Sequence, residues 1–216
     1  MQLVYRRIAR LLNIPRERWY DRRHGVDTAG AEQHLDADQL EDSVRYQATA
    51  PRVFRRILNA LPVEPAEYVF VDLGSGKGRA LVMAAGLGFR EVIGVEVSER
   101  LHRIAKRNIA EIQTAPAREN TAQPRFNLTR ADAATYSIPA GRTLVYLYNP
   151  FGPPTLKEVA KRVAEAASAS GPEFFVVYYN PVHTSVFDDV REIVRFRRGR
   201  GYVVYRARGY LAATTR

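Results

Sequence analysis

Residues 68–80, YVFVDLGSGKGRA, decide the fold of this chain. An apolar, Val-containing stretch ends in a loop with Gly74, Gly76 and Gly78, and a helix-forming run follows directly. Glycine lets the backbone turn sharply and approach a ligand closely. In an open α/β sheet, ligands bind beyond the carboxyl ends of the strands. The stretch therefore predicts a buried strand, a ligand-binding glycine loop and a helix, in that order.

Two common glycine loops do not fit this stretch. The dinucleotide fingerprint needs a glycine three residues after Gly76, where this chain has Arg79. The phosphate loop needs Ser or Thr directly after Gly-Lys, and Gly78 occupies that position. Asp72 stands two residues before the first glycine. An acid there favours a ligand with cationic or amine groups over a pyrophosphate.

Strands and helices are predicted to alternate outward from this stretch. Short Val- and aromatic-rich runs predict buried strands, amphipathic runs predict helices, and Ser98 is a plausible N-cap. Such alternation is typical of an α/β fold with a parallel sheet and helices on both faces. Two final runs around Gly199 and Gly201 predict a closing antiparallel hairpin. The predicted strands are 67–74, 91–97, 125–132, 143–150 and 172–181, the helices are 78–88, 98–113 and 155–170, and the hairpin arms are 190–198 and 201–209.

The N-terminal part has a different pattern. Residues 3–12 have apolar side chains at helical spacing, residues 17–36 read as a long irregular connection, and residues 51–61 return to helical periodicity. Pro62 stops that last helix. We therefore expect a helical N-terminal cap over residues 1–62 and a ligand-binding domain over residues 63–216.

Length and composition exclude several classes of protein. A chain of 216 residues with 46% hydrophobic residues supports one domain with a sizeable core. It has no cysteine, which excludes disulfides, thiolate metal sites and cysteine nucleophiles. No apolar run reaches the roughly 18 residues of a membrane span, and no secretory signal or metal-ligand spacing is visible. A cytoplasmic protein is expected.

The formal net charge of +10 is concentrated at the two ends of the sequence. Residues 1–23 have seven Arg against two acids, a net charge of +5, and residues 191–216 have eight Arg against one acid, a net charge of +7. Residues 24–190 have a net charge of −2. A basic surface attracts nucleic acid, acidic protein or anionic lipid. Codon bias from a GC-rich genome is the preferred explanation of this Arg excess, because 29 of the 33 basic residues are Arg.

Three acids follow three successive predicted strands, namely Asp72, Glu96 and Asp132. A carboxylate at the end of the second strand can accept hydrogen bonds from both hydroxyls of a ribose. An acid after the third strand can accept one from the exocyclic amine of adenine. Together with the glycine loop, these acids predict a pocket for a nucleoside without phosphates, such as S-adenosylmethionine.

Residues 68–136 resemble the class I S-adenosylmethionine-dependent methyltransferases, through VFVDLGSGKGRAL, GVEV and RADA. The resemblance implies a Rossmann-like, seven-stranded sheet and a role for each motif residue. The amino-acid part of the cofactor would lie against Asp72, Gly74, Ser75 and Gly76, the ribose against Glu96, and the adenine against Asp132 and Ala133.

The fourth predicted strand ends in YLYNPFGP, residues 146–153. This is similar to the Asn/Asp-Pro-Pro-Tyr/Phe motif of amino-group methyltransferases, with one proline instead of two. The resemblance implies that Asn149 and the Pro150 carbonyl would accept hydrogen bonds from the amine, and that Phe151 would pack on the acceptor. Asn149 would also border the cofactor. Tyr146, Tyr148, Tyr178, Tyr179, Asn180 and His183 are further polar candidates near this position.

The upstream RYQATAPRVFRRIL, the glycine loop and NPFGP resemble the non-SET histone lysine methyltransferases. That likeness implies that Tyr46 and Thr49 close over the methionine end of the cofactor. DRRHGVDT, residues 21–28, is similar to a segment of bacterial methyltransferases with the same loop. The expected activity is N-methylation of a protein lysine or a similar amine. A nucleic-acid methyltransferase, a small-molecule methyltransferase and a cofactor-binding module without turnover remain open alternatives.

Overall fold

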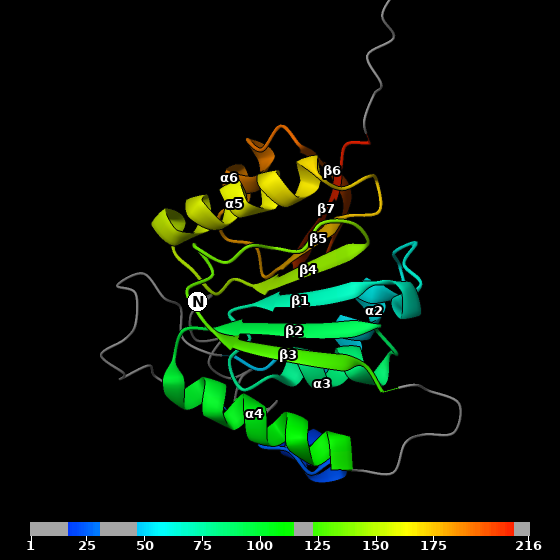
Figure 1. Cartoon of the computed structure of the whole chain (residues 1–216), viewed down its shortest axis with the longest axis vertical. Helices are drawn as coiled ribbons and strands as arrows, with labels where there is room; N and C mark the ends of the chain where they lie inside the picture. The colour runs from blue at the N-terminus through cyan, green and yellow to red at the C-terminus, as the bar shows by residue number, and fades with distance from the viewer. Residues whose placement is uncertain (1–16, 31–46, 115–122, 210–216) are drawn as a thin grey trace, which may run out of the picture.

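The computed structural model describes residues 17–30, 47–114 and 123–209 and contains one seven-stranded sheet (Figure 1). The strand order is β3-β2-β1-β4-β5-β7-β6. The predicted helix over residues 3–12 and the predicted site residue Tyr46 lie outside the described residues. The strands are β1 (Val69–Leu73), β2 (Glu91–Glu96), β3 (Arg125–Arg130), β4 (Thr143–Tyr148), β5 (Phe175–Tyr179), β6 (Ile193–Gly199) and β7 (Tyr202–Ala207).

Strand β1 lies near the middle of the sheet and pairs in parallel with β2 on one side and β4 on the other. The chain order therefore reverses between β1 and β4, which is where open α/β sheets bind their ligands. Strands β5 and β7 pair antiparallel, as do β6 and β7. The predicted parallel sheet with a closing antiparallel hairpin is confirmed.

Helices cover both faces of the sheet (Figure 1). Val69 and Val71 of β1 pack in a core with α5, whereas Phe70 between them packs in a second core with α2 and α3. Both faces of β1 are buried, so its sequence shows an almost continuous apolar run and no alternation. The helices are α2 (Pro51–Leu58), α3 (Arg79–Gly86), α4 (Glu99–Thr114), α5 (Pro153–Ser168) and α6 (Thr184–Asp188), with a 3-10 turn, η1 (Pro65–Glu67).

The helix ends follow local capping chemistry. Ser98 Oγ accepts a hydrogen bond from Leu101 N at 3.3 Å, which confirms Ser98 as the N-cap of α4. Pro51 is the first residue of α2, where its missing N–H costs nothing.

The prediction of an irregular connection over residues 17–36 is wrong at its start, because residues 17–24 are helical. This helix ends at Gly25, which has a φ of +66°, and Val26 N donates to Asp21 O at 3.1 Å across the turn. A left-handed glycine with such a bond is a common helix C-terminus. Tyr20 and Val26 are buried in the core that also contains Phe54. Residues 17–24 are too short and too polar to show a helical apolar pattern, because their burial depends on contacts with distant parts of the chain.

The division of the chain at residue 62 stays a prediction. Tyr20 and Phe54, from the predicted cap, share one core with Phe70 of β1. None of the helices within the described residues is long and apolar enough to cross a membrane.

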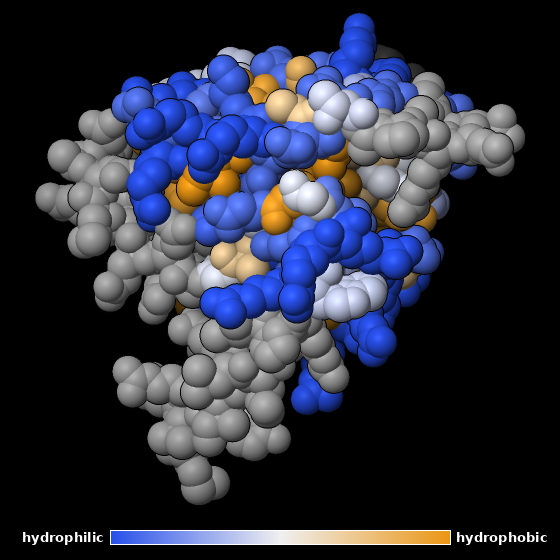
Figure 2. Space-filling model, turned by 90° about the horizontal axis from the view of Figure 1, so that it is seen from below, coloured by the Kyte–Doolittle hydropathy of each residue, from blue (hydrophilic) through white to orange (hydrophobic). Residues whose placement is uncertain are grey.

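Charge is distributed differently in space than along the sequence. Figure 2 views the molecule from below Figure 1, the side on which α4 lies, and this face is largely hydrophilic with small apolar patches. Helix α4 exposes Arg103, Lys106 and Arg107. The net charge of residues 24–190 is close to zero, but within this range α4 has a basic exposed face.

Candidate active site

The glycine loop joins β1 to α3 and is fixed to the end of β2. Gly74 N and Ser75 N both donate to Val95 O, at 2.9 and 3.0 Å. Gly74, Gly76 and Gly78 have φ values of 78°, 55° and 83°, a left-handed conformation that other residues adopt only with strain. The three glycines are therefore required by the backbone path of the loop.

Glu96, at the end of β2, lies beside this loop. Its Oε2 accepts a hydrogen bond from Gly76 N at 2.8 Å, and its Oε1 accepts one from Ser98 N at 2.9 Å. These two bonds fix the carboxylate at the end of β2, next to the backbone of the glycine loop. The predicted role of Glu96 in binding the ribose stays a prediction.

Asp72 is buried under the loop, and no described side chain or backbone group donates a hydrogen bond to its carboxylate. Burial and, second, the negative charge of Glu96 hold the pKa of Asp72 well above its usual range. The two neighbouring carboxylates place negative charge at the ends of β1 and β2. This environment fits the ammonium group and the sulfonium of S-adenosylmethionine.

The third acid, Asp132, follows β3. Its Oδ1 accepts a hydrogen bond from Ala134 N at 2.8 Å, which fixes the turn in which Ala133 is buried. Ala131 N donates to Glu96 O at 3.2 Å and joins this turn to the end of β2. The structure therefore brings Asp72, Glu96 and Asp132 to one edge of the sheet, at the ends of three adjacent strands.

The NPF segment after β4 packs directly on the glycine loop. A Cβ atom added to Gly74 would lie 2.5 Å from Pro150 Cβ and 3.6 Å from Phe151 Cζ. Gly74 therefore allows two segments that are far apart in the sequence to touch. Phe151 is only 7% exposed and belongs to the core with α5, so its proposed packing on an acceptor stays a prediction.

Asn149 is held in place by the neighbouring strand. It has a φ of 41° and is 9% exposed. The Tyr178 hydroxyl accepts a hydrogen bond from His183 N at 3.4 Å and is 2.8 Å from Asn149 Oδ1. Since the hydroxyl already accepts from a backbone N–H, its own proton is directed to Asn149 Oδ1. In this contact His183 takes part through its backbone and not through its ring.

Thr49, from the N-terminal part of the chain, contacts β4 through Tyr146. Its Oγ1 lies 3.1 Å from the hydroxyl of Tyr146, and the Tyr148 hydroxyl donates to Gln47 Oε1 at 3.1 Å. The rings of Tyr148 and Tyr179 lie 4.4 Å apart at the ends of adjacent strands. Burial raises the pKa of Tyr146 well above its usual range and raises the pKa of Tyr179. These tyrosines are therefore neutral hydrogen-bonding groups at pH 7.

Sequence reasoning missed one polar residue that holds the loop. Asn108 of α4 is buried and donates from Nδ2 to Lys77 O at 2.8 Å. It lies on the apolar stripe of α4 with Leu101, Ile104 and Ala105. A polar residue on the buried stripe of an amphipathic helix was the available signal, because buried amides need partners.

We expect Gly74→Ala to destabilise the protein by about 2 kcal/mol or more. The substitution imposes a left-handed φ on alanine and presses its Cβ against Pro150. Chemical denaturation measures the change. Gly88→Ala is the matched control, since Gly88 has a φ of 83° with no atom within 4 Å. An equal loss in both variants would show that contact with Pro150 contributes nothing.

Comparisons with known proteins agree with this geometry. A family model described as "Histone methylation protein DOT1" matches residues 33–131, which include the glycine loop, Asp72 and Glu96 and end one residue before Asp132. No curated protein sequence matches the chain.

Solved structures of methyltransferases share the fold. The Escherichia coli protein YhhF, a candidate methyltransferase, is 13% identical with a TM-score of 0.58, and the match covers 83% of this chain and 99% of that one. A candidate S-adenosylmethionine-dependent methyltransferase of Methanococcus maripaludis is 12% identical with a TM-score of 0.57, covering 74% and 84%. Magnesium protoporphyrin IX methyltransferase of Synechocystis, solved with bound S-adenosylmethionine, is 15% identical with a TM-score of 0.50, covering 74% and 79%.

The strand order, the three acids beside a glycine loop and the family match lead to one assignment. The chain is a class I S-adenosylmethionine-dependent methyltransferase.

Proposed function

We propose that this methyltransferase N-methylates an amine, with a lysine side chain of a protein as its acceptor. The observation that carries the proposal is the contact between Gly74 and Pro150, since it holds Asn149 at the edge of the cofactor loop. The matching family model is described as a histone methylation protein, and this description supports a protein acceptor.

The cofactor would be held by the residues that its chemistry requires. Asp72 and the loop of Gly74, Ser75 and Gly76 would bind its amino-acid part. When bound, S-adenosylmethionine supplies an electrophilic methyl group on a sulfonium. Glu96 would accept hydrogen bonds from the ribose hydroxyls, and Asp132 with Ala133 would bind the adenine.

The chain would prepare the acceptor chiefly by removing it from water. A lysine amine attacks only after it loses a proton, and an uncharged, partly buried environment favours its neutral form. Asn149 and Tyr178 supply such an environment, because burial raises the pKa of Tyr178 and keeps its hydroxyl neutral. Asn149 and the Pro150 carbonyl would accept hydrogen bonds from the amine and orient its lone pair, which is the main requirement of an in-line transfer.

The test is transfer of a tritiated methyl group into a cell extract by the full chain. We expect label that protease removes and nuclease leaves, and methyl-lysine after acid hydrolysis. Label on molecules that pass a small-pore filter, or no label despite cofactor binding by calorimetry, would contradict the proposal. Heat-treated enzyme is the control.

A nucleic acid is the second candidate acceptor, and a specific surface favours it. Trp19 is 59% exposed, and Arg23 Cζ lies 5.6 Å from its ring centre. Asp27 N donates to Asn108 Oδ1 at 2.8 Å, so this segment lies against the basic helix α4. Exposed aromatic and cationic side chains can stack on bases and bind phosphates. This alternative predicts nuclease-sensitive label and an affinity for RNA or DNA that falls steeply with salt.

A further inference from the structure

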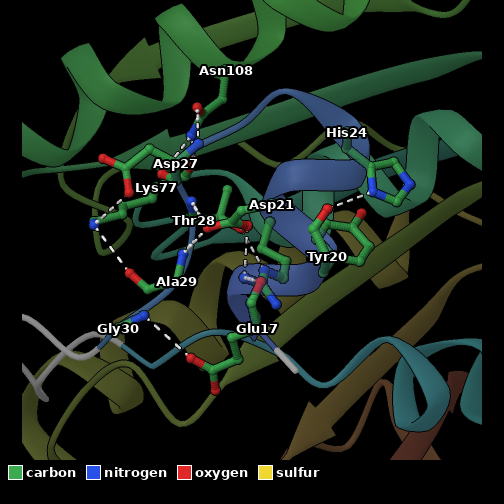
Figure 3. Close-up of polar contacts among 11 residues, drawn as sticks. Glu17, Tyr20, Asp21, His24, Asp27, Thr28, Ala29, Gly30, Lys77 and Asn108 are labelled. Atoms are coloured by element: carbon green, nitrogen blue, oxygen red, sulfur yellow. Dashed lines mark hydrogen bonds and ion pairs between the residues drawn. The ribbon is translucent and has the colours of Figure 1, made fainter. Parts of the chain in front are cut away.

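Lys77 of the cofactor loop points toward residues 17–30 (Figure 3), and Arg79, which follows the loop, binds the same segment. Lys77 is 4% exposed, and its Nζ lies 3.3 Å from both Asp27 Oδ1 and Ala29 O. Arg79, the first residue of α3, is 1% exposed. The loop therefore resembles a phosphate loop in its composition, but its cations bind the N-terminal segment of the same chain.

Asp21 is the centre of these contacts. Arg79 donates from Nη2 to Asp21 Oδ1 at 2.9 Å and from Nε to Thr28 Oγ1 at 2.5 Å. The Thr28 hydroxyl donates to Asp21 Oδ1 at 2.6 Å, and Thr28 N and Ala29 N donate to Asp21 Oδ2 at 2.8 and 2.6 Å. Four donors thus converge on one buried carboxylate. A buried charge pair with this many hydrogen bonds has a well-defined geometry.

Two further contacts fix the same segment. The Arg79 guanidinium carbon lies 4.6 Å from the centre of the Tyr20 ring, which allows a cation–π interaction. Asn108 of α4 binds Asp27 through both its amide nitrogen and its oxygen, and also binds Lys77 O. Residues 17–30, the loop and α4 therefore form one hydrogen-bonded unit.

We propose that Asp21, Thr28 and Arg79 form a clasp that positions the cofactor loop, so that residues 17–30 determine how tightly the enzyme binds S-adenosylmethionine. The loop contains three glycines in left-handed conformations, and glycine has the most conformational freedom to lose on ordering. A loop that is ordered before binding spares the complex that entropic cost. The contacts of the clasp are separate from those that Glu96 and Pro150 make with the loop. Its three members are positioning residues that do not touch the cofactor.

The test is the affinity of the full-length Asp21→Asn variant for S-adenosylhomocysteine, measured by calorimetry well below its melting temperature. The amide cannot accept all four donors and removes the charge opposite Arg79. We expect the dissociation constant to rise about tenfold, a typical coupling between two sites. Backbone amides of residues 74–79 should also exchange hydrogen faster in the ligand-free variant.

Thr28 offers a milder and better matched pair. Thr28→Ser keeps the hydroxyl between Arg79 and Asp21, and Thr28→Val keeps the shape of threonine without it. We expect the serine variant to bind S-adenosylhomocysteine as tightly as the unmodified protein does, and the valine variant to bind it more weakly. This pair decides the question if Asp21→Asn fails to fold.

Asp188→Asn is the control for a general loss of stability. Asp188 binds Arg195 Nε at 2.6 Å and the Tyr205 hydroxyl at 3.0 Å, near β6 at the far edge of the sheet. We expect a lower melting temperature and an unchanged dissociation constant in this variant. The clasp proposal is overturned if Asp21→Asn and Thr28→Val have lower melting temperatures but bind S-adenosylhomocysteine as tightly as the unmodified protein. That result would leave the methyltransferase assignment and its acceptor untouched.

Discussion

Asn149→Ala is expected to lower the rate of methyl transfer about 100-fold, while the affinity for S-adenosylhomocysteine stays within a few-fold of normal. The substitution removes the side-chain oxygen that is held by Tyr178 at the edge of the cofactor loop. Loss of a group that orients a reactant costs a factor of this size, since small errors in alignment sharply reduce productive encounters. The measurement is single-turnover transfer of a labelled methyl group to the acceptor that the extract experiment identifies.

Asn180→Ala controls for the backbone. Asn180 also has a positive φ, of 50°, and also precedes a proline, at the end of the adjacent strand β5. Both variants force alanine into a left-handed conformation and should lose similar stability. We expect the larger loss of rate for Asn149→Ala, because Pro150 and not Pro181 contacts Gly74. Equal rates in the two variants would remove Asn149 from the proposed acceptor site.

Asp72→Asn is expected to weaken S-adenosylmethionine binding about 30- to 100-fold, as for the loss of a charged hydrogen bond worth about 2–3 kcal/mol. The ligand-free variant should unfold at a higher temperature than the unmodified protein. Asp72 is buried beside Glu96, and its raised pKa shows that its charge is unfavourable there until a cation arrives. Calorimetry and thermal melting of the same samples measure both effects. A variant that binds normally would show that Asp72 does not face the amino group of the cofactor.

The raised pKa of Asp72 also predicts opposite pH trends for binding and stability. The folded state binds the proton of Asp72 more tightly than the unfolded state, in which the pKa of Asp72 is close to 4. The ligand-free protein should therefore gain stability as pH falls through the raised pKa toward 4. Cofactor affinity should fall over the same range, because protonation removes the charge that binds the ammonium. Asp72→Asn should flatten that part of both profiles.

Local patterns were enough to predict the sheet and the cofactor edge. In residues 68–80, the Val-rich run predicts a buried strand and the three glycines predict a sharply turning loop. The acid predicts a ligand with cationic groups, and these three predictions agree with one another. Asp72, Glu96 and Asp132 could be predicted as neighbours, because parallel strands bring their carboxyl ends to one edge. The hairpin was also visible from two apolar runs around Gly199 and Gly201.

The contacts of residues 17–30 were not visible in the same way. Asp21, Thr28 and Arg79 are separated by up to 58 positions, and each is an ordinary surface residue by type. Only their burial together makes them partners. The helix over residues 17–24 depends on the same docking, since its sequence has no periodic apolar stripe.

The sequence by itself determined the class of enzyme, the cofactor and the edge of the sheet that binds it, because these depend on backbone conformation and on strand order. Tertiary structure alone decided that residues 17–30 bind Arg79, next to the cofactor loop, and that Tyr178 holds Asn149. Those contacts join segments far apart in the chain, and their specificity comes from side-chain packing that no local pattern encodes. Gly74 connects the two levels: its left-handed φ is a property of the loop, and its contact with Pro150 exists only in the folded chain.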